Sequence, residues 1–486
     1  MNTRSPELLL PAGSLDRMRA AYDFGADAVY AGQPRYSLRA RNNEFRLEQL
    51  AQGIAEAHAR GKRFFVTSNL IAHNDKVRTY LRDLAPVVEL RPDALIMADA
   101  GLIMLVREEM ERGRWPEVPI HLSVQANSTN WAAVKFWQRA GVSRIILSRE
   151  LSLGEIEQIR NECPDVELEV FVHGALCIAY SGRCLLSGYF NRRDPNQGTC
   201  TNACRWSYST QPGGEANDSG EVQPEALPAA LAAGERFDFA AEQAQADESF
   251  AACGGAQRHP LADRVWLMEE GERPGQLMPV MEDEHGTYIL NSKDLRAIEH
   301  VERLVAIGVD SLKIEGRTKS RYYVARTAQA YRRAIDDAVA GRRFDPALLT
   351  DLESLASRGY TSGFLERHAT QDTQNYLSGS SEARRSQFVA EVLSVGADGW
   401  AEVETKNRFA VGDTLEVVHP AGNRLLTLAE MRNTDGEPVS AALGSPVKVR
   451  IPIGAPAEGA LIARVFADGP PGDRGRVNPV TPEPLP

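Results

Sequence analysis

The chain has 486 residues, of which 43% are hydrophobic and 25% charged, and it carries a net charge of −11. This length suits one large domain with a small one, and this composition is that of a soluble globular protein. No apolar run approaches the ~18 residues of a membrane helix, and the acidic balance excludes a wholly basic nucleic-acid coat protein. The first residues, MNTRSPELLLPAG, lack the apolar region and cleavage site of a signal peptide. We therefore expect a cytoplasmic protein with reduced thiols.

Short apolar runs alternate with amphipathic helical stretches through the first third of the chain, which is typical of parallel βαβ units. Helices are expected, for example, at Ser14–Phe24 and Leu47–Arg60. The predicted strands are Glu7–Pro11, Ala28–Ala31, Arg63–Ser68, Ala94–Ala98, Ile120–Val124, Arg144–Leu147, Leu168–Val172 and, much later, Ser311–Ile314. Eight such units predict a TIM-type (β/α)8 barrel over residues 1–370, with a long insertion between strands seven and eight. A doubly wound open sheet is the alternative.

The insertion contains an acidic stretch, about 209–262, that is poor in aliphatic residues, and we expect it to be largely irregular. After a polar connector, short alternating strands with Gly turns predict a small C-terminal all-β barrel over residues 385–467. Residues 468–486 are rich in Pro and Gly, and we expect a loose tail.

Four of the six cysteines lie within 28 residues, at Cys177, Cys184, Cys200 and Cys204. In a reducing compartment such a group indicates a metal site or redox chemistry, and soft thiolates suit zinc or an iron–sulfur cluster. Only the last pair has the spacing of a zinc knuckle, so spacing leaves the metal open. Four unrelated buried thiols are the other interpretation. Because Cys177 follows strand seven, the group is expected at the C-terminal face of the barrel, where active sites of this fold lie.

Polar residues near the strand ends are the candidates to line that face. Candidate catalytic residues are His173, Glu169, Lys313 and Arg149. His173 can transfer protons or serve as a hydrogen-bonding histidine. Glu169 is expected to face the barrel interior and pair with Lys313, which favours a structural role. Candidate substrate-binding residues are Asn69, Gln125, Asn127, Arg317, Arg35, Arg39 and Arg41, the last three being suited to gripping carboxylates or phosphates.

A second basic feature lies at Gly316–Ala334, where six Lys or Arg residues and three tyrosines occur without an acid. This pattern indicates either a nucleic-acid-binding patch or the solvated face of a helix.

The stretch ELEVFVHGALCIAYSGRCLLS, residues 167–187, resembles the signature of the peptidase U32 family. The matching positions are Glu169, Phe171, Gly174, Cys177, Gly182, Cys184 and Ser187. The stretches DPNQGTCTNACRW, EDEHGTYILNSKDL and SLKIEGRTKS, with residues 7–45, are similar to the branch of that family that makes 5-hydroxyuridine at the wobble position of bacterial tRNA. The likeness covers nearly the whole chain.

The resemblance implies a tRNA-modifying enzyme that hydroxylates uridine without molecular oxygen and depends on prephenate. It also implies a [4Fe-4S] cluster held by Cys177, Cys184, Cys200 and Cys204. The implied partners are a tRNA anticodon loop, prephenate, and iron–sulfur assembly and electron-transfer proteins. A loop base can be splayed into a site at low cost, as this chemistry requires.

Two other classes of function remain open. One is a U32-type peptidase, although the chain has neither the H-E-x-x-H nor the G-x-S-x-G pattern. The other is a tRNA-binding scaffold with a structural metal site, for which the C-terminal domain would serve in docking.

Overall fold

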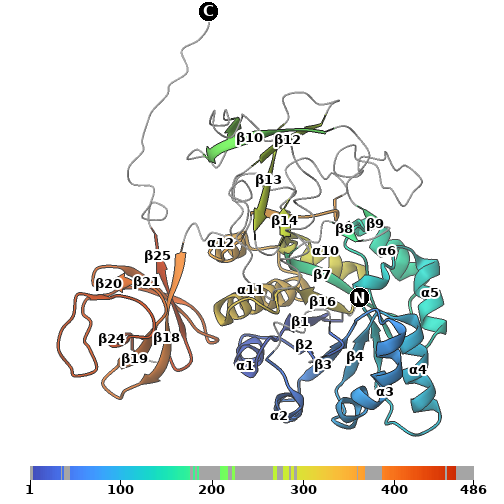
Figure 1. Ribbon diagram of the computed structural model, residues 1–486. Coiled ribbons are helices and arrows are strands. Elements are labelled where there is room, and N and C mark those ends of the chain that lie inside the picture. The colour runs from blue at the N-terminus through green and yellow to red at the C-terminus, as the bar shows by residue number, and fades with distance from the viewer. Residues whose placement is uncertain are drawn as a thin grey trace, which may run out of the picture.

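The computed structural model describes residues 4–33, 35–37, 44–175, 293–357, 359–366, 386–454 and 457–466, together with the backbone of short strands between residues 179 and 288. The described part comprises a barrel with surrounding helices, short strands of the insertion, and a C-terminal sheet (Figure 1). None of its helices is long and apolar enough to cross a membrane.

Eight parallel strands close the barrel, which confirms the predicted fold class. The strands are β1 (Glu7–Pro11), β2 (Ala28–Gly32), β3 (Arg63–Ser68), β4 (Ala94–Met97), β5 (Ile120–Leu122), β6 (Arg144–Ile146), β7 (Glu167–Ala175) and β16 (Ser311–Ile314). Each pairs with the next along the chain, and β16 pairs with both β7 and β1. The barrel therefore closes across the insertion, and the open-sheet alternative is wrong.

Helices follow the strands and pack around them (Figure 1). They are α1 (Leu15–Asp23), α2 (Leu47–Ala59), α3 (Asn74–Glu89), α4 (Ala100–Glu111), α5 (Trp131–Arg139), α6 (Leu153–Glu162), α10 (Val301–Ile307), α11 (Arg321–Val339) and α12 (Ala347–Glu353). Local caps mark several starts: the hydroxyls of Ser14, Ser152 and Ser320 each accept a backbone N–H of the first turn. These caps fix where the chain turns from a strand end into a helix.

The strand β7 is longer than predicted and carries an irregularity near its end. Its pairing with β16 shifts register between Lys313 and Ile314, and its last residues pair antiparallel with β15 (Asp294–Arg296). β15 also pairs with β17 (Tyr360–Thr361). The expected strand ended at Val172, because the apolar run stops there and the partner β15 lies more than a hundred residues away.

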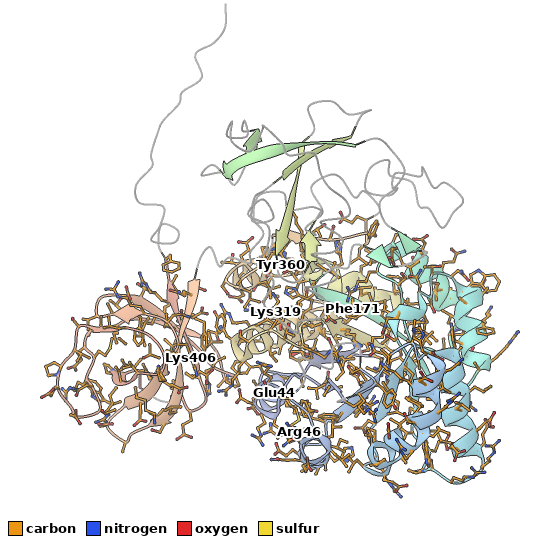
Figure 2. All side chains as sticks on the ribbon, in the orientation of Figure 1. Glu44, Arg46, Phe171, Lys319, Tyr360 and Lys406 are labelled. Carbon is orange, nitrogen blue, oxygen red and sulfur yellow. The ribbon has the colours of Figure 1, made fainter. Side chains whose placement is uncertain are left out.

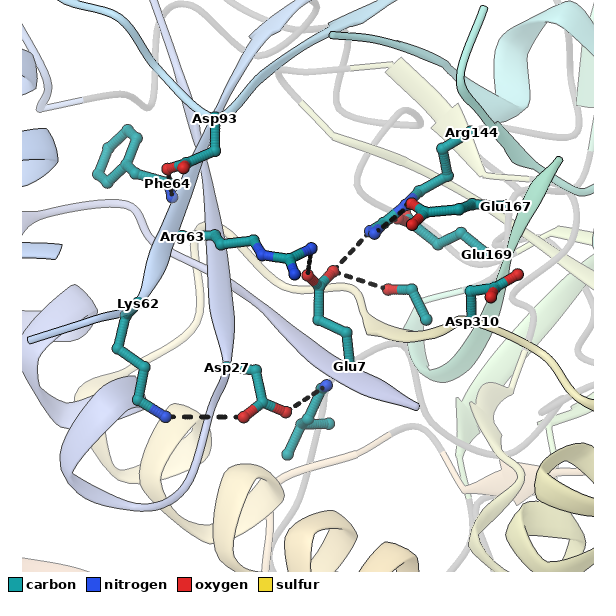
Figure 3. A network of polar contacts seen from close by, with 12 residues as sticks. Glu7, Asp27, Lys62, Arg63, Phe64, Asp93, Arg144, Glu167, Glu169 and Asp310 are labelled. Atoms are coloured by element: carbon teal, nitrogen blue, oxygen red, sulfur yellow. Dashed lines mark hydrogen bonds and ion pairs between the residues drawn. The ribbon is translucent and has the colours of Figure 1, made fainter. Parts of the chain in front are cut away.

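The lower interior of the barrel is charged, whereas branched apolar residues usually fill this fold. The guanidinium group of Arg144 bonds Glu7 at 2.5 Å, Glu167 at 2.8 Å and Glu169 at 3.2 Å (Figure 3). Burial alone would lower the pKa of Arg144, but attraction by Glu7 and Glu169 outweighs it and the pKa is raised. This network joins β1, β6 and β7 from inside.

The C-terminal domain is an antiparallel half-barrel with its own core. Its six-stranded sheet runs β22 (Arg424–Thr427), β21 (Thr414–Val418), β25 (Leu461–Val465), β18 (Ser386–Val395), β19 (Trp400–Thr405) and β24 (Lys448–Pro452). A two-stranded sheet, β20 (Phe409–Ala410) with β23 (Ala441–Ala442), accompanies it. The all-β prediction for this domain is confirmed.

The C-terminal domain packs on α11 of the barrel. Arg326 bonds both carboxylate oxygens of Glu416 at 2.9 and 3.0 Å, and the ring of Tyr322 stacks on Phe388 with centroids 5.1 Å apart. Val418, Leu461 and Ala463 belong to the same buried cluster as the barrel core. The long helix is thus covered on two sides, by barrel and sheet.

Backbone strands also occur within the insertion. They are β8 (Ala179–Tyr180), β9 (Arg183–Cys184), β10 (Tyr208–Ala216), β11 (Val222–Pro224), β12 (Trp266–Glu270), β13 (Leu277–Asp283) and β14 (Gly286–Tyr288). Because β10 and β11 lie within 208–224, the expectation of an irregular stretch is wrong for its first part. The remainder of that stretch, and the tail, lie outside the described residues.

Candidate functional site

The candidate site is the C-terminal face of the barrel, here called the mouth, where the parallel strands end. Asn69 follows β3 and donates to the Gln125 side chain, which follows β5, at 2.6 Å. The Asn127 side chain accepts a 2.8 Å bond from Ser148, just after β6. Asn127 adopts left-handed backbone angles with φ 53°, which an asparagine tolerates. The structure therefore brings together the predicted amide side chains of strands three and five.

Arg317, after β16, lies across the mouth toward β3. Its guanidinium group bonds the hydroxyls of Ser37 at 2.8 Å and Thr67 at 3.0 Å, and only 7% of the residue is exposed. A Cβ on Gly13 would lie 2.2 Å from the Arg317 carbonyl oxygen, so glycine is required where the end of β1 meets this loop. Arg317 is thus fixed by neighbours that are distant in sequence.

Arg149, after β6, meets Glu315, after β16. Its guanidinium carbon lies 3.9 Å from the centroid of the Phe171 ring, and its Nη1 donates to the Ala175 carbonyl at 2.8 Å. Its Nη2 lies 4.0 Å from Glu315 Oε2, which also accepts a 3.1 Å bond from the Tyr30 hydroxyl. The sequence marked Arg149 and Glu315 as strand-end candidates, and the structure brings them together with Tyr30 and Phe171.

Below the mouth, Lys313 and Glu169 form a buried ion pair at 2.7 Å, which confirms the predicted pairing. The Lys313 ammonium also lies 4.4 Å from the centroid of the Tyr30 ring. Burial lowers the pKa of Lys313, and Glu169 offsets part of this effect. Glu169 continues into the Arg144 network, so the pair links the mouth to the charged interior. A catalytic role for either residue stays a prediction.

His173 lies within β7 rather than after it, and its ring is fully buried among Tyr323, Tyr331 and Tyr360. The Tyr331 hydroxyl donates its proton to the Val172 carbonyl at 2.7 Å. His173 Nδ1 lies 3.3 Å from the Tyr331 hydroxyl oxygen, so Nδ1 is assigned as the N–H donor to that oxygen. Burial lowers the pKa of His173 to about 3, with Arg296 and Lys319 contributing. Proton transfer by a histidine that titrates near neutrality does not fit this geometry, whereas the hydrogen-bonding alternative does. Figure 2 labels Tyr360, which contacts the His173 ring, together with Phe171 and Lys319.

The arginines after β2 do not form one described group. Arg35 is exposed and pairs with Asp83 of α3 at 2.7 Å. Arg39 and Arg41 lie outside the described residues.

The predicted basic patch on α11 is wrong in this structure. Arg321, Arg326, Arg332 and Arg333 form ion pairs with carboxylates of other segments. The tyrosines Tyr322, Tyr323 and Tyr331 are buried. The helix therefore serves packing, and Arg317, which precedes it, contributes its guanidinium group to the mouth.

The cysteine group begins where the mouth ends. Cys177 comes two residues after Ala175, the last residue of β7. Cys177, Cys200 and Cys204 lie outside the described residues, and Cys184 is described only as backbone of β9. Elsewhere in the described ranges, no group of three or more His, Cys, Asp or Glu side chains is arranged to hold a metal ion. The four thiolates are the soft donor set that an iron–sulfur cluster takes, and their chain segment leaves the barrel at the mouth.

Sequence reasoning missed several residues of the mouth and the interior. Tyr30, Ser37 and Thr67 carry no motif, and Glu7, Arg144 and His121 look like ordinary charges of short strands. His121 is buried inside the barrel, where burial and Arg144 lower its pKa. A signal was available for Glu7 and Arg144, because charged residues inside predicted buried strands need partners.

Comparison with known families agrees with this architecture. The model of peptidase family U32 matches residues 13–375, and that of the peptidase family U32 C-terminal domain matches residues 384–464. The chain belongs to peptidase family U32. The two matches correspond to the barrel with its insertion and to the C-terminal half-barrel of this U32 protein.

Individual U32 relatives extend the likeness over nearly the whole chain. The tRNA hydroxylation protein P of Escherichia coli is 58% identical over 92% of this chain and 94% of its own length. The protein of the same name from Haemophilus influenzae is 55% identical over 90% of this chain and 91% of its own. A more distant relative is the 23S rRNA 5-hydroxycytidine C2501 synthase of Escherichia coli, 28% identical over 85% of this chain and 52% of its own.

Proposed function

We propose that this U32 protein is a tRNA hydroxylase that converts wobble uridine to 5-hydroxyuridine. The observation that carries the proposal is the 58% identity to a tRNA hydroxylation protein along nearly all of both chains. The name of the rRNA relative supports the same chemistry, because it describes hydroxylation at C5 of a pyrimidine. The proposed partner is the anticodon loop of tRNA in the cytoplasm.

The proposal includes a [4Fe-4S] cluster, with Cys177, Cys184, Cys200 and Cys204 as its ligands. A cluster of this kind supplies electron transfer or a Lewis-acidic iron when bound. The chain's own residues would act beside it: Asn69, Gln125 and Arg317 orient the RNA, and Phe171 and Tyr30 exclude water from the face below Arg149. The buried Lys313–Glu169 pair supports the floor of this site.

Prephenate is the proposed co-substrate, and the reaction is proposed to proceed without molecular oxygen. Prephenate is a dicarboxylate, and bidentate arginine contacts suit its two carboxylates. Arg39 and Arg41, after β2, are the proposed contacts. Iron–sulfur assembly and electron-transfer proteins are proposed as further partners.

The test is production of the modified nucleoside. The gene is expressed in a bacterial strain whose own 5-hydroxyuridine pathway has been deleted, and tRNA nucleosides are analysed by mass spectrometry. We expect 5-hydroxyuridine to appear with the wild-type chain, to vanish with Cys177→Ala, and to vanish in a host that cannot make prephenate. Absence of 5-hydroxyuridine with a well-expressed wild-type chain would contradict the proposal and favour a peptidase or a scaffold.

The cluster has its own measurement. Anaerobic purification followed by iron and sulfide analysis is expected to give about four of each per chain, with loss in Cys177→Ala and Cys200→Ala. Retention of the metal in Cys163→Ala, a buried cysteine at the end of α6, is the matched control. Zinc, or no metal, would remove the cluster from the proposal.

A further inference from the structure

Arg149 and Glu315 lie side by side at the mouth without a hydrogen bond between Arg149 Nη2 and the Glu315 carboxylate. In Arg149, Nη1 is used by Ala175, whereas the buried Nε has no hydrogen-bond partner among the described residues. Its Nη2 lies 4.0 Å from Glu315 Oε2, too far for a hydrogen bond. Nε and Nη2 form one edge of the guanidinium group, so a two-donor edge lies beside a carboxylate without bonding it.

The backbone around β7 fixes both members of the pair. The Glu315 N–H donates to the His173 carbonyl at 2.8 Å, and the Glu315 carbonyl accepts the Tyr323 hydroxyl at 2.8 Å. Gly174 has φ +103°, and a Cβ there would lie 2.5 Å from the backbone carbonyl oxygen of Glu315. The next residue, Ala175, holds Arg149. The spacing of donor edge and acceptor is therefore set before any ligand arrives, which lowers the cost of binding.

We infer that this pair reads the edge of the splayed base, with the Arg149 edge donating to uracil O4 and Glu315 accepting from N3–H. Uracil carries this acceptor and this donor on adjacent ring atoms, C4 and N3, whereas cytosine presents the opposite pattern, so uracil can satisfy both groups. A carboxylate at the same place would meet Glu315, whose charge repels it. The inference rests on the proposed function, because it assumes that the base entering the mouth belongs to tRNA.

The buried position gives the contact its selectivity. Arg149 has only 14% of its side chain exposed, and Glu315 11%. When a base lacks the matching group, the buried Arg149 edge keeps a donor without an acceptor, or Glu315 lacks its contact from the base, and a site of this kind rejects the analogue strongly. We expect each lost contact to weaken binding roughly ten-fold or more.

The experiment measures binding of anticodon stem-loop RNAs that differ only at the wobble position. The four RNAs carry uridine, N3-methyluridine, a pyrimidin-2-one nucleoside lacking O4, or an abasic site. The full-length holoprotein is used anaerobically without prephenate, so that no turnover occurs. The variants are Glu315→Met and Arg149→Met, which keep length but remove the polar groups. Arg112→Met, at the far end of α4, is the matched control.

The wild-type protein and the Arg112→Met control are expected to bind the uridine RNA at least roughly ten-fold more tightly than the other three. In Glu315→Met the penalty for N3-methylation should shrink to within about two-fold, and in Arg149→Met the penalty for losing O4 should do the same. Unchanged affinity for the abasic RNA would show that both variants fold and still hold the phosphate backbone.

Equal affinity of the wild type for all four RNAs would overturn the inference while leaving tRNA binding intact. So would variants that lose affinity equally for every RNA. If Arg149→Met keeps the uridine preference but weakens prephenate binding, the edge is a carboxylate site and the inference is wrong. Failure of the proposed function is distinct, since no 5-hydroxyuridine would then form in cells whatever the binding results.

Discussion

Gly174 lies in β7 next to Ala175, where this strand closely approaches the loop that carries Glu315. Its positive φ favours glycine, and its missing side chain leaves room for the Glu315 backbone. Gly308 has a similar positive φ of +84°, but no atom lies within 4 Å of the Cβ that a substitution would add. Substituting each glycine in turn therefore distinguishes the cost of the left-handed backbone conformation from the cost of a steric clash.

Replacing Gly174 by Ala is expected to cost roughly 3 kcal/mol of unfolding free energy and to abolish 5-hydroxyuridine formation, because the Glu315 loop must shift. Gly308→Ala carries only the strain of the left-handed conformation, about 1 kcal/mol, and should keep activity. Urea denaturation and nucleoside analysis measure both effects. Equal losses for the two variants would show that the close approach at Gly174 has no consequence.

His173 makes the stability of the protein depend on pH. Its pKa is about 3 in the folded chain, through burial, and near 6.5 when unfolded. Between these values the unfolded chain binds a proton that the folded chain does not. Stability is therefore complete above about pH 6.5 and falls as the pH drops toward 3, by at most about 1.4 kcal/mol per pH unit from this residue.

The variant His173→Gln keeps a donor for the Tyr331 hydroxyl and removes the titration. Its unfolding free energy should fall less between pH 7.5 and pH 5.5 than that of the wild type. His121, whose pKa is also lowered by burial, contributes to both proteins and cancels in the difference. Identical pH dependence in the two proteins would contradict the buried, neutral state of His173.

At the scale of the element, the sequence predicts the boundaries of α11 but not the partners of its charged residues. Its boundaries follow from a Ser cap and a long amphipathic run, and helices after the eighth strand were expected from the sequence. Its basic residues were read as either a nucleic-acid patch or a solvated helix face, because the acids that neutralise them, such as Asp27, Asp345 and Glu416, come from other segments of the chain. A sequence window around a helix contains its charges but not their partners.

Arg326 on this helix is expected to hold the C-terminal domain in place. Arg326→Met leaves the Glu416 carboxylate at the domain interface without its two charged bonds, which should cost about 2–3 kcal/mol. Arg333→Met removes an exposed pair with Asp345 and should cost less than about 1 kcal/mol. Urea denaturation gives both values, and limited proteolysis between the domains reports separation. Similar costs for the two variants would argue against a specific role for the Arg326 pair.

At the scale of the whole molecule, most of the barrel follows from the sequence, since seven runs of buried residues alternate with helices before the insertion. The predicted bounds differ by a few residues where strands end, as at β7, because pairing with β15 extends the strand beyond its apolar run. The mouth was foreseen as a set of strand-end residues, and their pairing was foreseen only for Glu169 with Lys313. Contacts such as Arg317 with Thr67 depend on the stagger of strands around the closed barrel, which no local pattern encodes.

Arg144 is expected to be essential for the closed barrel, because it neutralises carboxylates from β1 and β7 in the interior. Arg144→Met should destabilise the protein by about 3–5 kcal/mol, since Glu7 and Glu169 would remain buried with too little positive charge. Arg63 also pairs with Glu7, at 3.1 Å (Figure 3), but about half of the Arg63 side chain is exposed. Arg63→Met is the matched control and should cost under about 1 kcal/mol. A small loss for Arg144→Met in urea denaturation would show that the network contributes little.

The pairing of β16 with both β7 and β1 has a consequence for synthesis on the ribosome. β7 ends at Ala175 and β16 begins at Ser311, so at roughly 5–20 residues per second the last strand emerges on the order of ten seconds after the seventh. During that interval the nascent chain exposes two open edges, on β1 and β7, each able to pair with a foreign strand. The newborn protein therefore passes through a period of vulnerability to aggregation, which ends when a single four-residue strand inserts between the two edges.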